Sequence, residues 1–205
     1  LWLGRTSIMG SNSPVGRMTC STTMLRIFLE YLEVMMSRQI LLCVETNSKA
    51  RTDYQYINET IHRFYVNDPK ISYKPIFLES KSMYALPKKQ REIGKYIKAY
   101  PEDTTVIYFI DLDDYDTNYE TKKLFEDIKK YCETHAYELV FFCRDVEEVY
   151  LGKRVNDKDK VNEVKRFKSK KMIEAVLPQN LSQNEYKING SNILNVLDKF
   201  WTRKN

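Results

Sequence analysis

From Ser37 onward, short runs of apolar residues alternate with longer segments in which apolar residues recur at helical spacing. β-Branched and aromatic residues dominate the short runs, as is typical of strands buried in a sheet. The pattern predicts strands at residues 39–45, 71–78, 105–110 and 137–143. It predicts helices at residues 51–65, 87–100 and 117–135. The run TVIYFI at 105–110 is the most apolar of these segments, which predicts a central strand.

This alternation predicts an α/β domain, with Rossmann-like βα units around a mainly parallel four-stranded sheet and flanking helices. The chain beyond the fourth strand predicts a strongly basic helix at 157–176, a polar loop at 178–190 and a short closing helix at 191–201 capped by Ser191. We expect residues 153–205 to form a basic helical extension that packs on the same domain.

The first 35 residues differ from the rest of the chain. They do not begin with Met, show no clear periodicity before Met24 and end at the pair Met35-Met36. Residues 24–35 are amphipathic enough for a short helix, but the order of segments in a secretory signal is absent. We therefore expect residues 1–35 to be a non-native or disordered extension, and we place the working domain at 36–152. A mitochondrial transit peptide is the alternative, because no acidic residue precedes Glu30.

Composition narrows the class of protein. The 205 residues are 42% hydrophobic and 30% charged, with only 6 Gly, 6 Pro and 4 Cys, as in one ordinary globular domain. No apolar run reaches the roughly 18 residues of a membrane-spanning helix, so no membrane partner is expected. The cysteines show no metal-ligand spacing, which favours free thiols in a reducing cytoplasm over a zinc site.

Acidic residues follow three of the predicted strands. Glu45 ends the first strand, Asp111, Asp113 and Asp114 follow the third, and Asp145, Glu147 and Glu148 follow the fourth. The carboxyl ends of parallel strands meet at one edge of a sheet, where ligands and active sites collect. We therefore expect some of these carboxylates to converge.

The spacing of Asp111 and Asp113 indicates a particular chemistry. Alternate residues leaving a strand project to the same side, so both carboxylates can reach one ion while Leu112 points into the fold. Convergent carboxylates without His or Cys suit Mg²⁺ or Mn²⁺, which activate water and stabilise leaving oxygens in phosphodiester hydrolysis. The alternative is an acidic turn that only caps the following helix, with Asp116 or Thr117 as the N-cap.

These motifs resemble those of the TOPRIM domain, which is shared by topoisomerases, primases, OLD-family nucleases and small defence-associated proteins of the RloB family. The segment QILLCVE is similar to the first family motif, with Glu45 as its acid, and YFIDLDDYD to the second, with Asp111 and Asp113. TDYQYI is similar to a further motif of the RloB-like proteins and places Asp53 in its acidic position. The segment RDVEEVYLG places Glu148, or else Glu147, where these proteins carry another Glu.

The resemblance implies a magnesium- or manganese-dependent nuclease, in a prokaryotic or phage-defence context, that works with a protein partner such as an ATPase or another defence subunit. It implies Glu45, Asp111 and Asp113 as catalytic residues and, with Glu148, as metal ligands. Asp53, Asp114 and Glu147 are further candidates.

Two alternatives to this function stay open. Thr46 stands where the family usually has Gly, which keeps open a non-catalytic module that binds nucleic acid or a partner protein. The other alternative is a phosphoacceptor receiver domain, which also gathers acids at strand ends.

A basic segment follows the acidic motifs. Nine Lys and Arg residues but only three acids lie between Lys153 and Lys171, so this stretch carries a charge of about +6, whereas the whole chain carries +5. Such an excess predicts contacts with a phosphate backbone, whose affinity falls with salt. The candidate nucleic-acid-binding residues are Lys158, Lys165, Arg166, Lys168 and Lys170. The alternative is a solvated helix face that serves only solubility.

Overall fold

The computed structural model of the protein describes residues 37–100 and 103–204. Residues Met36–Asn205 form one compact unit. The predicted N-terminal extension, with its amphipathic segment at 24–35, lies outside the described residues. No helix in the described part of the chain is long and apolar enough to cross a membrane. Three of the four cysteines, Cys43, Cys132 and Cys143, are buried free thiols, and Cys20 lies outside the described residues.

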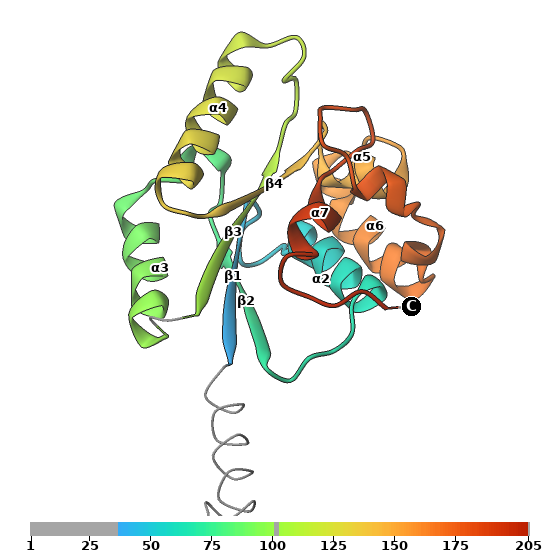
Figure 1. Cartoon of the computed structure of the whole chain (residues 1–205). Coiled ribbons are helices and arrows are strands. Elements are labelled where there is room, and N and C mark those ends of the chain that lie inside the picture. The colour runs from blue at the N-terminus through green and yellow to red at the C-terminus, as the bar shows by residue number, and fades with distance from the viewer. Residues whose placement is uncertain (1–36, 101–102, 205) are drawn as a thin grey trace, which may run out of the picture. The chain divides into compact units, whose positions relative to one another are not determined.

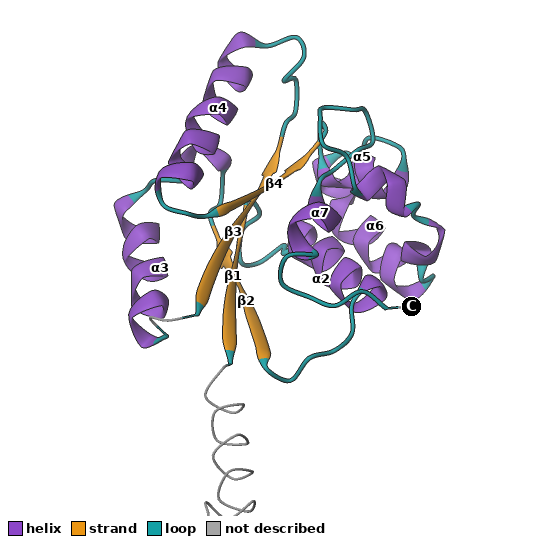
Figure 2. Ribbon diagram, viewed as in Figure 1, coloured by secondary structure: helices purple, strands orange, loops and turns teal. Residues whose placement is uncertain are grey.

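The unit is built on a four-stranded sheet whose strands are all parallel, in the order β2-β1-β3-β4 (Figure 2). The strands are β1 (Arg38–Val44), β2 (Ile71–Phe77), β3 (Thr104–Asp111) and β4 (Glu138–Phe142). β1 and β3 occupy the middle because their side chains are mostly apolar and both of their faces are covered. The predicted α/β fold with a mainly parallel four-stranded sheet is confirmed.

Helices cover both faces of this sheet (Figure 1). The helices of one layer are α3 (Pro87–Ala99) and α4 (Tyr119–Thr134), and those of the other are α2 (Thr52–Phe64), α5 (Val146–Leu151), α6 (Asp157–Ser169) and α7 (Ile193–Leu197). Short 3-10 turns are η1 (Lys81–Met83), η2 (Met172–Ala175) and η3 (Pro178–Leu181). The connection that leaves β1 therefore passes over one face, and the connection that leaves β3 passes over the other.

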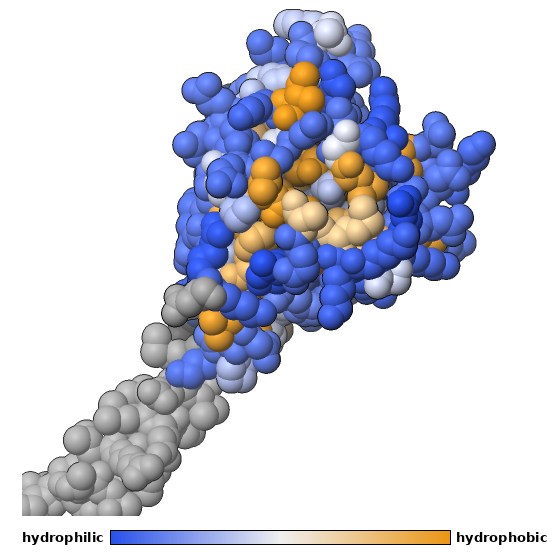
Figure 3. All heavy atoms as spheres, turned by 90° about the vertical axis from the view of Figure 1, so that its right-hand side faces the viewer, coloured by the Kyte–Doolittle hydropathy of each residue, from blue (hydrophilic) through white to orange (hydrophobic). Residues whose placement is uncertain are grey.

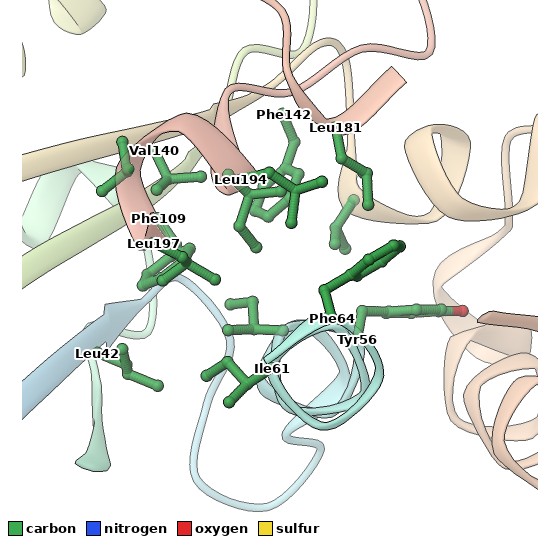
Figure 4. Close-up of a cluster of buried hydrophobic side chains, with 14 of the residues drawn as sticks. Leu42, Tyr56, Ile61, Phe64, Phe109, Val140, Phe142, Leu181, Leu194 and Leu197 are labelled. Carbon is green, nitrogen blue, oxygen red and sulfur yellow. The ribbon is translucent and has the colours of Figure 1, made fainter. Parts of the chain in front are cut away.

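Alternation along each strand divides the core between the two layers. Leu42 of β1 and Phe109 of β3 pack with Ile61 of α2 and Leu194 of α7 in the larger cluster (Figure 4). The side chains at odd positions of β1, such as Leu41, pack on the other face under α3 and α4. Residues of α6, η3 and α7 contribute to the larger cluster, so the expected C-terminal extension shares the core of the domain.

The C-terminal segment also closes the outer edge of β4. Asn192 uses its side-chain amide in place of a strand: Oδ1 accepts from the amide of Phe141 at 2.9 Å, and Nδ2 donates to the carbonyl of Leu139 at 3.0 Å. Ser191 forms an antiparallel bridge with Phe142. These contacts satisfy an edge that would otherwise expose backbone donors and acceptors.

Three boundaries differ from the sequence prediction. The basic helix ends at Ser169 and not at 176, because Lys171 adopts a left-handed conformation with φ 49° and a 3-10 turn follows. The predicted polar loop contains η3, which buries Leu181. The closing helix covers only Ile193–Leu197, and Asn192 occupies its N-cap position. Ser191 pairs with β4, and its hydroxyl also accepts a hydrogen bond of 3.1 Å from the amide of Ile193, the first residue of the helix.

The N-cap of α4 also differs from the prediction. The cap is Asn118, whose side chain accepts hydrogen bonds from the amides of Glu120 and Thr121, so neither Asp116 nor Thr117 caps this helix.

Candidate functional site

The carboxyl ends of β1 and β3 meet at the point where their connections diverge to opposite faces of the sheet. Glu45 follows β1, and its Oε1 accepts a hydrogen bond of 2.7 Å from the backbone amide of Asp111 at the end of β3. Glu45 does not pair with Arg51, whose guanidinium lies over the ring of Phe77 at 5.3 Å. The structure therefore brings the acids of the first two predicted motifs together.

Asp53 joins this pair from the first turn of α2. Its side chain is buried, and Oδ1 accepts a hydrogen bond of 3.2 Å from the hydroxyl of Thr52. α2 begins just beyond the loop that follows Glu45, so the start of the helix places Asp53 beside the strand ends. Thr46, the residue that replaces the expected Gly, lies in this loop without a positive φ, so the missing Gly causes no backbone strain there.

The short helix α5 supplies a fourth carboxylate. Its N-cap Asp145 accepts a hydrogen bond of 2.7 Å from the amide of Glu148, which fixes the first turn. Glu147 then faces inward and is fully buried, whereas Glu148 turns to Arg144, with 2.9 Å between Oε1 and Nη1. The predicted ligand Glu148 is thus bound to an arginine, and Glu147 is the residue of this pair that approaches the other acids.

Asp113 and Asp114 leave the cluster in different ways. Asp113 has a left-handed φ of 43°, and its carboxylate forms an ion pair with Lys81 of η1. Lys81 also donates to the backbone carbonyl of Asp111 at 2.8 Å, so it joins the two acids of the D-x-D motif. Asp114 is exposed, and its backbone carbonyl accepts hydrogen bonds within the turn before α4.

A second lysine enters the cluster from α6. Lys160 Nζ lies 3.1 Å from Oε2 of Glu147, and Asp53 and Asp111 also act on its charge. Burial lowers the pKa of Lys160, but these three carboxylates outweigh burial and raise it above its usual value. Lys160 therefore stays protonated and supplies a positive charge inside the cluster.

The carboxylates are harder to ionise than ordinary acids. Burial raises the pKa of Glu45 to about 7, and Asp53 and Asp113 add to the rise, although Lys81 and the amide of Asp111 oppose it. Burial also raises the pKa of Glu147 to about 7, against the attraction of Lys160. The pKa of Asp111 is raised by burial and by its acidic neighbours. Such grouped, perturbed acids are typical of functional sites.

A cavity of about 380 Å³ opens beside these groups. Its lining includes Glu45, Asp53, Asp111, Asp157 and Lys160. The oxygen donors suit a hard divalent cation, and Oε1 of Glu147 is buried without a hydrogen-bond partner in the described chain. In the described residues, however, no group of three or more His, Cys, Asp or Glu side chains is already arranged to hold a metal ion. The carboxylate oxygens are suitable ligands for the predicted Mg²⁺ or Mn²⁺. The ammonium of Lys160 lines the same cavity.

The predicted nucleic-acid-binding residues all lie on or directly after α6, on the side of the molecule that Figure 3 views. That face shows hydrophilic residues around an apolar area. All five of these basic residues are exposed. Arg166 lies 3.5 Å from Glu163, and Lys168 lies 3.7 Å from Glu59. In the part of the chain that the structure describes, no ion pair engages the remaining three lysines, which are Lys158, Lys165 and Lys170.

Sequence reasoning did not single out Lys160 as a site residue, although a signal was present. Lys160, Val164 and Phe167 are spaced as residues on one face of a helix, and the two apolar members are buried in the core. A lysine in line with a buried stripe points toward the domain and away from solvent. The contact of Lys81 with the D-x-D motif was not predicted either, because nothing in the sequence around Lys81 indicates it.

Comparisons with family models, curated proteins and solved structures found no match for this chain.

Proposed function

We propose that this protein is a metal-dependent nuclease of the TOPRIM type, which hydrolyses phosphodiester bonds of nucleic acid with Mg²⁺ or Mn²⁺. The observation that carries the proposal is the meeting of three carboxylates at one cavity, Glu45 after β1, Asp53 of α2 and Asp111 of β3, with the buried Glu147 of α5 acting on Asp111. Burial is the largest cause of their raised pKa values, and repulsion from neighbouring acids adds to the rise for Glu45, Asp111 and Glu147. Lys81 and Lys160 offset only part of this negative charge, and a divalent cation would offset more of it.

Glu45, Asp53 and Asp111 would hold the cation, because all three line the cavity. A bound Mg²⁺ would supply Lewis-acid chemistry, polarising a phosphoryl oxygen and lowering the pKa of bound water. Asp113 is held by Lys81 and would help to position the end of β3 instead of binding the ion directly.

Glu45 is suited to proton transfer. While no cation is bound to it, its pKa of about 7 lies close to neutral pH, where a general acid or base is most effective, so proton transfer is its alternative role to holding the metal. Because Oε1 accepts the amide hydrogen of Asp111, the proton of the neutral acid resides on Oε2. Glu45 could therefore take a proton from an attacking water, or give one to a leaving oxygen, through that atom.

The exposed lysines of α6 support nucleic acid as the substrate. Lys158 belongs to the same helix as Lys160, which lines the cavity, so a phosphate backbone on this helix would run close to the carboxylates. Backbone contacts of this kind position a nucleic acid without selecting its sequence.

The test is cleavage of single-stranded, duplex and supercoiled DNA and of RNA by the full chain with Mg²⁺, Mn²⁺ or EDTA. We expect metal-dependent cleavage that falls at least about 100-fold in Glu45→Ala and in Asp111→Ala. Asp127→Ala, which removes an exposed carboxylate from α4, is the matched control and should retain activity. Equal activity in all four proteins, with circular dichroism showing that each is folded, would contradict the proposal.

One observation favours a second function, a binding module without catalysis. Lys160 and Lys81 already place positive charge among the acids, so the cluster is partly neutralised without a metal. In that case the chain would bind nucleic acid in EDTA and in Mg²⁺ with the same affinity and would cleave none of the substrates.

A further inference from the structure

We propose that Lys160 is an internal counter-ion of the carboxylate site, which holds Glu147 while no divalent cation is bound and releases it when one binds. This inference rests on the proposed function, because it concerns the same carboxylates. It adds to the proposed site a lysine whose ammonium leaves when the metal ion binds. Metal binding is then coupled to a movement of that side chain.

The position of Lys160 is the first argument. A lysine of a surface helix ordinarily extends its ammonium into water. Lys160 instead lies in line with Val164 and Phe167 on the buried side of α6, and only 23% of its side chain is exposed. Its ammonium is directed to Glu147 and lines the same cavity as Glu45, Asp53 and Asp111.

The charge balance of Glu147 is the second argument. Its side chain is fully buried, and Lys160 is its only ion-pair partner in the described chain. A buried carboxylate without a partner is strongly unfavourable, so the lysine is required as long as nothing else neutralises the site. An ammonium and a divalent cation in one cavity repel each other, and the charge of the bound cation would replace that of Lys160 in compensating Glu147.

An outer partner for the released lysine is already in place. Lys160 Nζ lies 3.9 Å from Oδ1 of Asp157, one helical turn earlier, whose side chain is fully exposed at 100%. Lys160 Nζ therefore already lies between an inner acid, the buried Glu147, and an outer acid, Asp157, which is exposed and lines the same cavity. Moving from the inner to the outer partner needs only rotations of that side chain, with α6 unchanged.

The first experiment measures the chemical reactivity of individual lysines in the full chain. An amine-reactive ester labels exposed ammonium groups, and mass spectrometry reports each site with EDTA, with Mg²⁺ and with Mn²⁺. We expect labelling of Lys160 to rise about fivefold or more when either metal is added, because the ammonium moves outward. Lys158 is exposed on the same helix and has no ion pair in the described chain, so its labelling should not change.

The second experiment measures Mn²⁺ affinity from the electron paramagnetic resonance signal of the free ion. Mildly alkaline buffer is used, because protons then compete least for the carboxylates. We expect Lys160→Met to bind Mn²⁺ about fivefold or more tightly than the parent, because a competing cation is removed. Lys158→Met removes the same charge from the same helix and should bind as the parent does. If Lys160→Met does not fold, Lys160→Met combined with Glu147→Gln replaces it.

The possible results separate this inference from the proposed function. Mn²⁺ binding and cleavage by the parent, with unchanged labelling of Lys160, would overturn the counter-ion role and leave the nuclease intact. Weaker Mn²⁺ binding in Lys160→Met would overturn it too, because the lysine would then support the metal and not compete with it. Absence of Mn²⁺ binding in the parent and in both variants would overturn the metal-dependent function and the inference together.

Discussion

Glu147 is the residue whose ionisation depends most directly on its surroundings. Its side chain is fully buried and faces Lys160 of α6, Asp53 of α2 and Asp145 at the start of α5. Burial is the largest influence and raises its pKa from 4.5 to about 7, while Lys160 limits the rise. A difference of this size corresponds to roughly 3 kcal/mol of unfavourable free energy for the ionised form.

This shift makes stability depend on pH. Between about 4.5 and about 7 the folded protein holds the proton on Glu147, whereas the unfolded chain has lost it. Stability is therefore highest toward the lower value and falls as the pH rises through about 7, in metal-free buffer. Glu147→Gln has no carboxyl to ionise at this position. We expect the free energy of unfolding of this variant to decrease by about 2–3 kcal/mol less than that of the parent over this pH range.

Urea denaturation at a series of pH values measures this effect. Glu126→Gln removes one exposed carboxyl from α4 and controls for the loss of a single negative charge. A decline in Glu147→Gln as steep as that of the parent would show that Glu147 is not the group responsible. Glu45 also has a pKa of about 7, so part of the decline should remain in the variant.

At the scale of elements, three glycines show how local geometry determines the effect of a Gly→Ala substitution on stability. Gly152 ends α5 with φ 67°, Gly94 lies within α3, and Gly190 precedes the segment that closes the edge of β4. A Cβ at Gly152 or Gly94 would meet nothing within 4 Å. A Cβ at Gly190 would lie 2.7 Å from the backbone carbonyl of Lys187 and 2.8 Å from Cγ of Gln183.

These surroundings predict changes in folding stability that differ in sign and size among the three Gly→Ala variants. Gly94→Ala should stabilise the protein by about 0.5–1 kcal/mol, because a helix interior favours Ala and space is available. Gly152→Ala should cost about 1 kcal/mol, because Ala disfavours the left-handed conformation. Gly190→Ala should cost about 2 kcal/mol or more, because backbone atoms must move. Thermal and urea denaturation of the three variants measure the order, and a Gly190→Ala protein as stable as Gly152→Ala would contradict the packing argument.

The elements themselves were largely predictable from the sequence. The four strands and the helices α2, α3 and α4 were predicted within a few residues, because each buries a continuous or periodic apolar pattern. The end of α6 was not predictable, because Lys171 adopts positive φ without the Gly or Asn that usually indicates it. Nor was the role of Asn192, whose side chain bonds to a strand that is distant in sequence.

The candidate site was predicted in part. Glu45 and Asp111 follow buried strands, so the parallel sheet alone places them at one edge. The choice between Glu147 and Glu148 depends on how α5 is rotated. That rotation is fixed by packing of Tyr150 on Tyr56, whose rings are stacked 5.2 Å apart. Contacts between segments that are distant along the chain produce no local pattern in the amino-acid sequence.

On the scale of the whole molecule, the exposed lysines of α6 lie outside the carboxylate cluster, which contains only Lys81 and Lys160 as positive charges in the described chain. The carboxylates gather at the ends of β1 and β3, while α6 carries exposed lysines on its outer side and Lys160 on its inner side. The net charge of +5 is too small to attract nucleic acid strongly by itself. Binding should therefore depend on where the lysines lie more than on their number.

Two triple variants should therefore differ in their affinity for nucleic acid in EDTA, where metal-dependent cleavage cannot interfere. Lys158, Lys165 and Lys170 of α6 and its C-cap are replaced by Ala in one, and Lys123, Lys129 and Lys130 of α4 in the other. Both lose three positive charges, and all six side chains are exposed. We expect only the first variant to bind an oligonucleotide more weakly. Each lost phosphate contact should also reduce the slope of log affinity against log salt by about 0.7–0.9.

Fluorescence anisotropy titrations at several salt concentrations measure both quantities, the affinity and its salt dependence. Equal losses in the two variants would mean that net charge alone attracts the nucleic acid, and α6 would then lose its role as the binding face, whatever the carboxylates do.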